Sequence, residues 1–234
     1  MPTGSGIRDY YDRNSFWFGA WERTRGPVAV HRPVWTPGVR SRRRALTVIH
    51  EEVAACCARL GARAVIDVGC GTGQLLVYLS EHTSGVRLAG ITASGAQAGV
   101  AREWFARHGG SAEIRVGDFL APGALSLQGG RRLLVAIESF VHSPHPRAFF
   151  SAAADAMDEG DSLLVCDDFL EPRTLSRRER RLADEFAAGW RAPAITTVEG
   201  CVRAATAARL TLREAHDWTA FVPAARSLSG ALLT

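Results

Sequence analysis

Three glycines, each separated from the next by one residue, form a short segment that could bind a small molecule. The segment Asp67-Val-Gly-Cys-Gly-Thr-Gly follows a short apolar run and contains Gly69, Gly71 and Gly73. Glycines permit a tight turn and let backbone amides approach a ligand closely. A dinucleotide-binding turn needs Gly-x-Gly-x-x-Gly, and Gln74 stands at its third position. A phosphate-binding P-loop needs a lysine, which the chain lacks. A glycine turn without any ligand is the alternative.

A carboxylate and an imidazole follow another apolar run and could act on a reacting group. Residues 132–139 predict a strand that ends in Ile137-Glu138-Ser139, with His142 just beyond. Glu138 could stabilise a positive charge or accept a proton, and His142 is a second candidate base. The alternatives are that Glu138 caps a helix or pairs with an arginine, and that His142 only makes loop hydrogen bonds. His142 and His145 lack a third ligand nearby, so no metal site is predicted.

The elements that position these residues alternate between strand and helix. Short apolar runs predict strands at 64–69, 86–92, 112–118, 132–139 and 161–168, and helical spacing predicts helices at 73–82, 95–108, 146–157 and 197–208. A further helix at 45–60 ends at Gly61, and 210–217 predicts a sixth strand. This alternation predicts an α/β fold with a mostly parallel sheet and helices on both faces. In such sheets ligands bind beyond the carboxyl ends of the strands, where the strand order reverses.

The length and composition predict a single domain over residues 1–234. The apolar content of 47% is ordinary for a globular protein, and no run of 18 apolar residues predicts a membrane span. The first thirty residues show no signal peptide. The five cysteines have no metal-ligand or disulfide-framework spacing, which favours reduced thiols and a cytoplasmic location.

Positive charge is concentrated at the N-terminus. Residues 1–44 carry a net charge of +6 and the remainder −2, and every basic residue is an arginine. The run Arg-Ser-Arg-Arg-Arg at 40–44 suggests a distant alternative, a protein that binds nucleic acid. Because the run is brief and the rest of the chain is slightly acidic, we expect no nucleic-acid partner.

The string VIDVGCGTG resembles the first motif of class I S-adenosylmethionine-dependent methyltransferases, and the resemblance extends over residues 60–170. It implies a Rossmann-like fold with S-adenosyl-L-methionine as cofactor. By this resemblance the glycine loop lies against the methionine part and Asp67 orients its amino group. Asp118 and Phe119, in the string VGDF, would hold the adenine.

A second string narrows the resemblance. GITASGAQ at 90–97 looks like the variant found in cyclopropane fatty acid synthases and in sterol and terpene C-methyltransferases. There a neutral threonine and a glutamine replace the usual ribose-binding acid, which implies cofactor contacts from Thr92, Ser94 and Gln97. The Ile-Glu-Ser string at 137–139 is similar to that of terpene C-methyltransferases, which implies a catalytic role for Glu138.

The flanking segments complete the resemblance. The aromatic-rich stretch 7–22, with Tyr11 and Trp17, looks like an N-terminal helix that closes over the ligands, although an ordinary core stripe explains it as well. An irregular arm at 26–44 offers His31, Arg32 and Arg40 to an anionic group. Residues 1–44 thus form a cap, 60–170 a cofactor-binding core, and 171–195 a lid inserted after the fifth strand.

The predicted reaction is methyl transfer to an alkene carbon of a small isoprenoid, such as isopentenyl or geranyl diphosphate, through a carbocation that then loses a proton. The expected partner is an apolar small molecule with an anionic head, and Mg²⁺ could take part only if that head is a diphosphate. A homo-oligomer is compatible with the sequence. The alternative is an O- or N-methyltransferase of an aromatic natural product.

Overall fold

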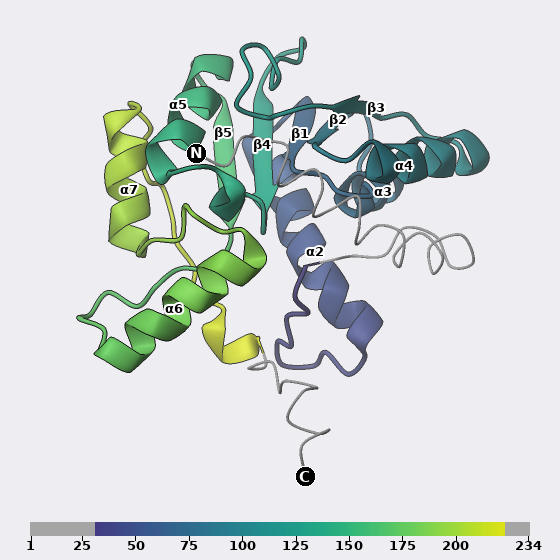
Figure 1. The fold of residues 1–234 in the computed structure, drawn as a ribbon. Coiled ribbons are helices and arrows are strands. Elements are labelled where there is room, and N and C mark those ends of the chain that lie inside the picture. Colours follow the sequence, from purple (N-terminus) through teal and green to yellow (C-terminus); the bar gives the residue numbers. More distant parts are fainter. Residues whose placement is uncertain (1–30, 223–234) are drawn as a thin grey trace.

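The computed structural model describes residues 31–222. Its helices and strands, in chain order, are α2 (Arg42–Leu60), β1 (Ala64–Val68), α3 (Gln74–His82), β2 (Arg87–Thr92), α4 (Gly95–His108), β3 (Glu113–Val116), β4 (Arg132–Ile137), α5 (Pro146–Ala156), β5 (Ser162–Cys166), α6 (Arg177–Trp190) and α7 (Val198–Ala207). Two short 3₁₀ turns, η1 (Phe140–His142) and η2 (Thr219–Phe221), complete them (Figure 1). The predicted N-terminal helix, with Tyr11 and Trp17, lies outside the described residues.

The strands form one parallel sheet in the order β3-β2-β1-β4-β5. Val65 of β1 pairs with Leu88 of β2 on one side and with Leu133 of β4 on the other. The chain moves outward from β1 to β3 and then returns to the centre, so the strand order reverses between β1 and β4. The predicted α/β, Rossmann-like methyltransferase fold is confirmed, and the carboxyl ends of β1 and β4 are its expected binding edge.

Helices cover both faces of the sheet (Figure 1). Strand β1 is buried along its whole length because its side chains enter two different cores. Val65 packs with residues of α2, α3 and α4. Ile66 and Val68 face the opposite way and pack with residues of α5 and α7. The buried centre of the sheet is therefore a rigid base for the loops at its carboxyl edge.

Helix α2 begins three residues before the predicted start. The side chain of Ser41 accepts a hydrogen bond from the amide of Arg44 and caps the helix, so the last part of the predicted arm is helical. Gly61 ends the helix with φ 62°, as predicted. The face that α2 buries includes His50, which the apolar pattern alone does not select.

The predicted sixth strand at 210–217 is wrong. The amide of Leu210 bonds to the carbonyl of Ala205 and closes the end of α7, and residues 211–217 then run exposed without joining the sheet. This segment is rich in charged side chains, and no strand among residues 31–222 pairs with it. Within that same range, no helix is long and apolar enough to cross a membrane.

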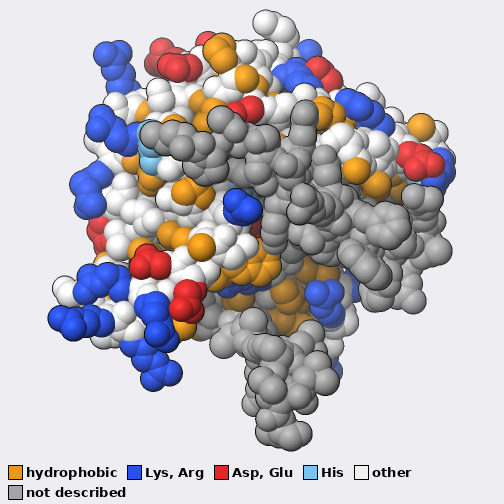
Figure 2. All heavy atoms as spheres, viewed as in Figure 1, with side chains coloured by type: hydrophobic (Ala, Val, Ile, Leu, Met, Phe, Trp, Pro, Cys, Tyr) orange, Lys and Arg blue, Asp and Glu red, His pale blue; other side chains and the backbone are white. Residues whose placement is uncertain are grey.

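Residues 171–195 contain a well-capped helix. Ser176 and Glu179 form a reciprocal capping box at the start of α6, and no residue of this helix is buried. Arginine side chains gather over α6 with acidic side chains between them (Figure 2). Arg173 pairs with Glu171 and Glu179, so part of this positive charge is neutralised locally.

Candidate functional site

The glycine loop connects β1 to α3 at the predicted binding edge, and its three glycines have different surroundings. All three have positive φ, a conformation that favours glycine. A Cβ on Gly69 would lie 2.4 Å from Cβ of Ser139, and one on Gly73 would lie 3.0 Å from Cβ of Ala101. A Cβ on Gly71 would meet nothing closer than Nε2 of Gln97 at 4.0 Å. Gly69 and Gly73 are therefore needed for packing, whereas Gly71 borders open space.

Asp67 is a buried carboxylate without a protein partner. The residue is 4% exposed, and its side-chain carboxylate has no hydrogen bond or ion pair within residues 31–222. Burial raises its pKa to about 7. An unpaired buried carboxylate is costly unless something else binds it. Its position beside the open side of the glycine loop fits the amino group of S-adenosylmethionine, so the residues present fit this cofactor.

The string GITASGAQ forms a connected group after β2. The hydroxyl of Thr92 donates to Oε1 of Gln97 at 2.8 Å. The amide of Gln97 donates to Oγ of Ser94 at 3.3 Å, so Ser94 caps α4. The hydrogen bond from Thr92 orients the amide of Gln97, so that its Nε2 donor faces Gly71 and the open space there. Thr92 and Gln97 thus present a neutral donor near the loop, which suits a hydroxyl-bearing ligand.

Asp118 and Phe119 follow β3 on the other side of β2. The carboxylate of Asp118 accepts a hydrogen bond from the amide of Leu120 at 2.8 Å, and its second oxygen is available in an exposed position. Phe119 is half-buried and meets Phe149 edge to face, with ring centroids 5.8 Å apart. Their role in gripping adenine stays a prediction, and their position at the same sheet edge is compatible with it.

Glu138 is held in an unusual backbone conformation at the end of β4. Its φ is 47°, in the left-handed region that non-glycine residues rarely adopt. Its amide donates to the carbonyl of Cys166 at 2.8 Å, and the next residue, Ser139, donates its hydroxyl to the carbonyl of Val68. The chain therefore turns sharply at Glu138, where Ser139 packs against Gly69. Strained residues that persist are concentrated at functional sites.

The side chain of Glu138 lies among other charged groups. Its Oε1 accepts a hydrogen bond of 2.7 Å from the backbone amide of Arg32. Burial raises the pKa of Glu138, the amide and guanidinium of Arg32 lower it, and the nearby Asp168 raises it. Within residues 31–222, Glu138 caps no helix and forms no ion pair with an arginine side chain, which were the alternatives from sequence.

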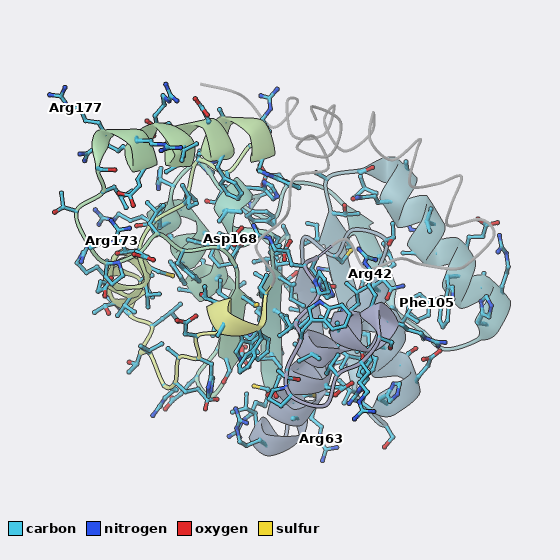
Figure 3. All side chains as sticks on the ribbon, turned by 90° about the horizontal axis from the view of Figure 1, so that it is seen from below. Arg42, Arg63, Phe105, Asp168, Arg173 and Arg177 are labelled. Carbon is cyan, nitrogen blue, oxygen red and sulfur yellow. The ribbon has the colours of Figure 1, made fainter. Side chains whose placement is uncertain are left out.

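Two further carboxylates, which sequence reasoning missed, follow β5. Burial raises the pKa of Asp167 to about 7, and Asp167 accepts hydrogen bonds from the amides of Val141 and Asp168. Asp168 forms an ion pair with Arg32. It lies among the elements near α6, whereas Arg173 and Arg177 stand at the outer surface (Figure 3). The signal was present, because both acids end a predicted strand at the ligand-binding edge.

The predicted acceptor-binding residues of the arm have separate positions. Both ring nitrogens of His31 are engaged, one with the carbonyl of Arg32 and one with His50. The guanidinium of Arg32 pairs with Asp168 and also lies 6.0 Å from the ring centre of Phe186 on α6. Arg40 is exposed and has no ion-pair partner within residues 31–222. Arg40 is therefore the best placed of the three to meet an anion.

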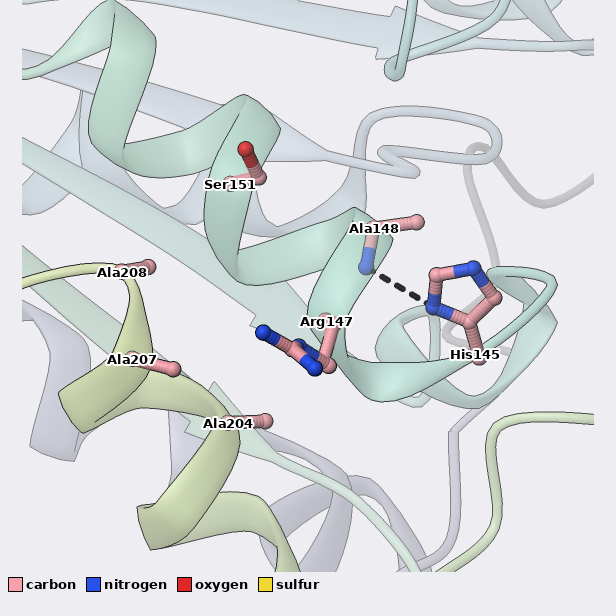
Figure 4. Close-up of a pocket in the computed structure, with 7 residues that line it drawn as sticks. All are labelled: His145, Arg147, Ala148, Ser151, Ala204, Ala207 and Ala208. Carbon is pink, nitrogen blue, oxygen red and sulfur yellow. Dashed lines mark hydrogen bonds between the residues drawn. The ribbon is translucent and has the colours of Figure 1, made fainter.

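The two histidines after β4 do not form a common site. Nδ1 of His142 lies 2.9 Å from the carbonyl oxygen of Arg191, and burial lowers the pKa of His142 while this hydrogen bond raises it. His145 caps α5, because its Nδ1 accepts from the amide of Ala148 at 3.1 Å (Figure 4). It borders an open hollow between α5 and α7 lined by His145, Arg147, Ala148, Ser151, Ala204, Ala207 and Ala208. No group of three potential metal ligands occurs in the described part of the chain.

Comparison with known proteins agrees with this geometry. Residues 65–160 match the family model described as a methyltransferase domain. Polyketide synthase ThaQ of Burkholderia thailandensis is 31% identical over 105 residues, which is 44% of this chain, and the match spans 5% of the synthase. The chain thus corresponds to a small part of that relative.

Two solved structures share the fold. Geranyl diphosphate C-methyltransferase from Streptomyces coelicolor A3(2) is 18% identical with a TM-score of 0.70, covering 95% of this chain and 84% of the other. The [4+2]-cyclase SpnF is 22% identical with a TM-score of 0.71, covering 89% and 72%. The matched domain and this fold define a class I methyltransferase domain. Residues 65–160 therefore form a domain of this class.

Proposed function

We propose that the protein transfers a methyl group to an alkene carbon of a small isoprenoid, and that Glu138 then accepts the proton released from the product. The observation that carries this proposal is Glu138 itself. It is a half-buried carboxylate in a left-handed conformation, at the carboxyl end of β4 beside the glycine loop. A substrate of this class is also named for the solved geranyl diphosphate C-methyltransferase that shares the fold.

The acidic character of the site suits a cationic intermediate. When bound, S-adenosylmethionine would supply the methyl group as an electrophile, and the electron pair of the broken S–CH3 bond would stay on sulfur in the leaving S-adenosylhomocysteine. The alkene gives its electron pair to a new C–C bond, and the positive charge remains on a neighbouring carbon. The carboxyl groups of Glu138, Asp167 and Asp168 would provide negative charge near that carbon. Charged groups that are already held in place stabilise a developing cation without having to reorganise. Loss of a proton to Glu138 restores the double bond.

An anionic head of the acceptor would bind away from these carboxylates. Glu138 and the two acids beside it, Asp167 and Asp168, repel a diphosphate, and the guanidinium of Arg32 is already paired with Asp168. Arg40, exposed just before α2, offers a forked donor for diphosphate oxygens. If the acceptor is a diphosphate, Mg²⁺ would bind together with its oxygens.

The experiment is product analysis of the wild-type protein and of Glu138→Gln. Isopentenyl diphosphate, geranyl diphosphate and phenolic acceptors are supplied with labelled cofactor, and products are identified by mass spectrometry. Glu138→Gln keeps the shape but loses the charge, so we expect kcat to fall about 100-fold or more with little change in KM. Glu159→Gln, the same change at an exposed residue, is the control. Labelling of phenols alone would reject the proposal.

A second candidate is O- or N-methylation of an aromatic natural product, because Glu138 and His142, which both follow β4, could equally remove a proton from an acceptor. In that reaction Glu138 or His142 removes a proton from the acceptor before transfer. High pH would then rescue Glu138→Gln, because a hydroxyl ionises by itself. An alkene has no such proton, so the absence of rescue distinguishes C-methylation.

A further inference from the structure

A pair of histidines lies behind the arm that reaches Glu138. His50 on α2 is 2% exposed, and its Nε2 lies 3.0 Å from Nε2 of His31. The two rings meet edge to face with centroids 4.9 Å apart. On the other side of the His31 ring, Nδ1 lies 3.0 Å from the carbonyl oxygen of Arg32. The three residues thus form one continuous hydrogen-bonded chain.

The direction of these hydrogen bonds follows from the acceptor at one end. A carbonyl oxygen can only accept a hydrogen bond. Nδ1 of His31 must therefore carry the hydrogen and donate a hydrogen bond to the carbonyl oxygen of Arg32. A neutral His31 must then accept at Nε2, which makes the Nε2–H of His50 the donor. Burial lowers the pKa of both imidazoles, that of His50 to about 3, so both are neutral at pH 7. His50 therefore fixes the tautomer and the orientation of His31.

Arg32 passes this constraint to the site. Its carbonyl is fixed by His31, its guanidinium pairs with Asp168, and its backbone amide donates to Oε1 of Glu138 at 2.7 Å. The guanidinium holds the far end of the side chain only, and a flexible stem separates it from the amide. The N–H of Arg32 belongs to the peptide plane that contains the carbonyl of His31. Its orientation therefore depends on the backbone at His31 and Arg32, which the His31 ring holds through its contacts with His50 and with the carbonyl of Arg32.

We propose that His50 is a positioning residue that, through His31 and Arg32, holds the backbone N–H that orients the carboxylate of Glu138. The catalytic meaning of this arrangement rests on the function proposed above. The arrangement itself concerns only residues of this chain and can be tested without any acceptor.

The charged groups that face Glu138 determine how its pKa changes when the hydrogen bond from the Arg32 amide is lost. They are Arg32 from the arm and Asp167 and Asp168 from the end of β5. The Arg32 amide is one of the influences that lower the pKa of Glu138 against burial. A misplaced amide therefore raises this pKa, whereas a general loss of stability leaves it unchanged in the folded protein.

The test is a titration of Glu138 followed by NMR in protein labelled at the glutamate carboxyl carbons, with Glu138→Gln used to identify the resonance. His50→Phe keeps a ring against Tyr78, whose centroid is 5.5 Å away, but removes the donor. His31→Phe removes the acceptor and leaves the core intact. His50→Gln restores a donor. His82→Phe, which changes a histidine stacked on Tyr78 but outside the chain of hydrogen bonds, is the matched control.

We expect Glu138 to titrate at higher pH in His50→Phe and in His31→Phe, with the double variant no different from either single one. His82→Phe should match the wild type, and His50→Gln should return towards it. An unchanged titration of Glu138 in His31→Phe would overturn the proposal. If His50→Phe does not fold, the titration of Glu138 in His31→Phe is sufficient to test it.

Kinetics separate this inference from the proposed function. With a methylated acceptor in hand, His50→Phe should lower kcat about 10- to 100-fold, leave KM unchanged, and move the acid limb of the kcat profile to higher pH. A loss in KM alone would overturn the positioning role. If the wild-type protein methylates no alkene, the proposed function fails, while the NMR titration still decides whether His50 positions Glu138.

Discussion

The left-handed backbone at Glu138 predicts that glycine is more stable than alanine at this position. Both substitutions remove the half-buried carboxylate, so their difference isolates the backbone. A left-handed conformation costs an L-residue about 1–2 kcal/mol. Glycine avoids that cost but loses more backbone entropy on folding, about 0.5–1 kcal/mol relative to alanine. The structure therefore predicts that Glu138→Gly exceeds Glu138→Ala in free energy of unfolding by about 0.75 kcal/mol, the difference between the centres of the two ranges.

Urea unfolding followed by far-UV circular dichroism measures this difference, which corresponds to roughly 1–4 °C in Tm. The same pair of substitutions at Glu159, whose φ is not positive, is the control and should favour alanine. Both Glu138 variants should also lose methyl transfer. If Glu138→Gly is no more stable than Glu138→Ala, the backbone there is not strained, and the argument that strain marks a functional residue fails.

Three further predictions concern the cofactor, the acceptor and pH. Gly71→Val should abolish binding of S-adenosylhomocysteine in calorimetry while the protein stays folded, because the new side chain enters the open space beside Gln97; unchanged affinity would refute the cofactor site. Arg40→Gln should raise KM for a diphosphate acceptor and leave cofactor affinity unchanged. An unaltered KM would show that Arg40 does not bind the acceptor. Burial raises the pKa of Asp67 to about 7, so the folded protein binds this proton more tightly than the unfolded chain does, and stability falls as pH rises from about 4 to 7. Asp67→Asn should therefore stabilise the cofactor-free protein more at pH 8 than at pH 5 in urea unfolding, and an equal gain at both would contradict the assigned pKa.

Local patterns account for the parts of the fold that sequence predicted well. The five strands and the helices between them follow from apolar runs and helical spacing, which depend on neighbouring residues. The wrong strand at 210–217 shows the limit of that reasoning. A strand needs a partner at the sheet edge, and a short apolar pattern does not reveal whether one is available.

The cofactor loop and the candidate base were determined by the sequence itself, because each lies at the end of an apolar strand and its neighbours in the chain form the turn. The tertiary structure decided what surrounds them. The amide of Arg32 and the carboxylate of Glu138 are 106 residues apart in the chain, and His31 meets His50 only because the arm packs along α2. Burial and long-range hydrogen bonds set the ionisation of Asp67 and the strain at Glu138, and neither is written in any local pattern of residues.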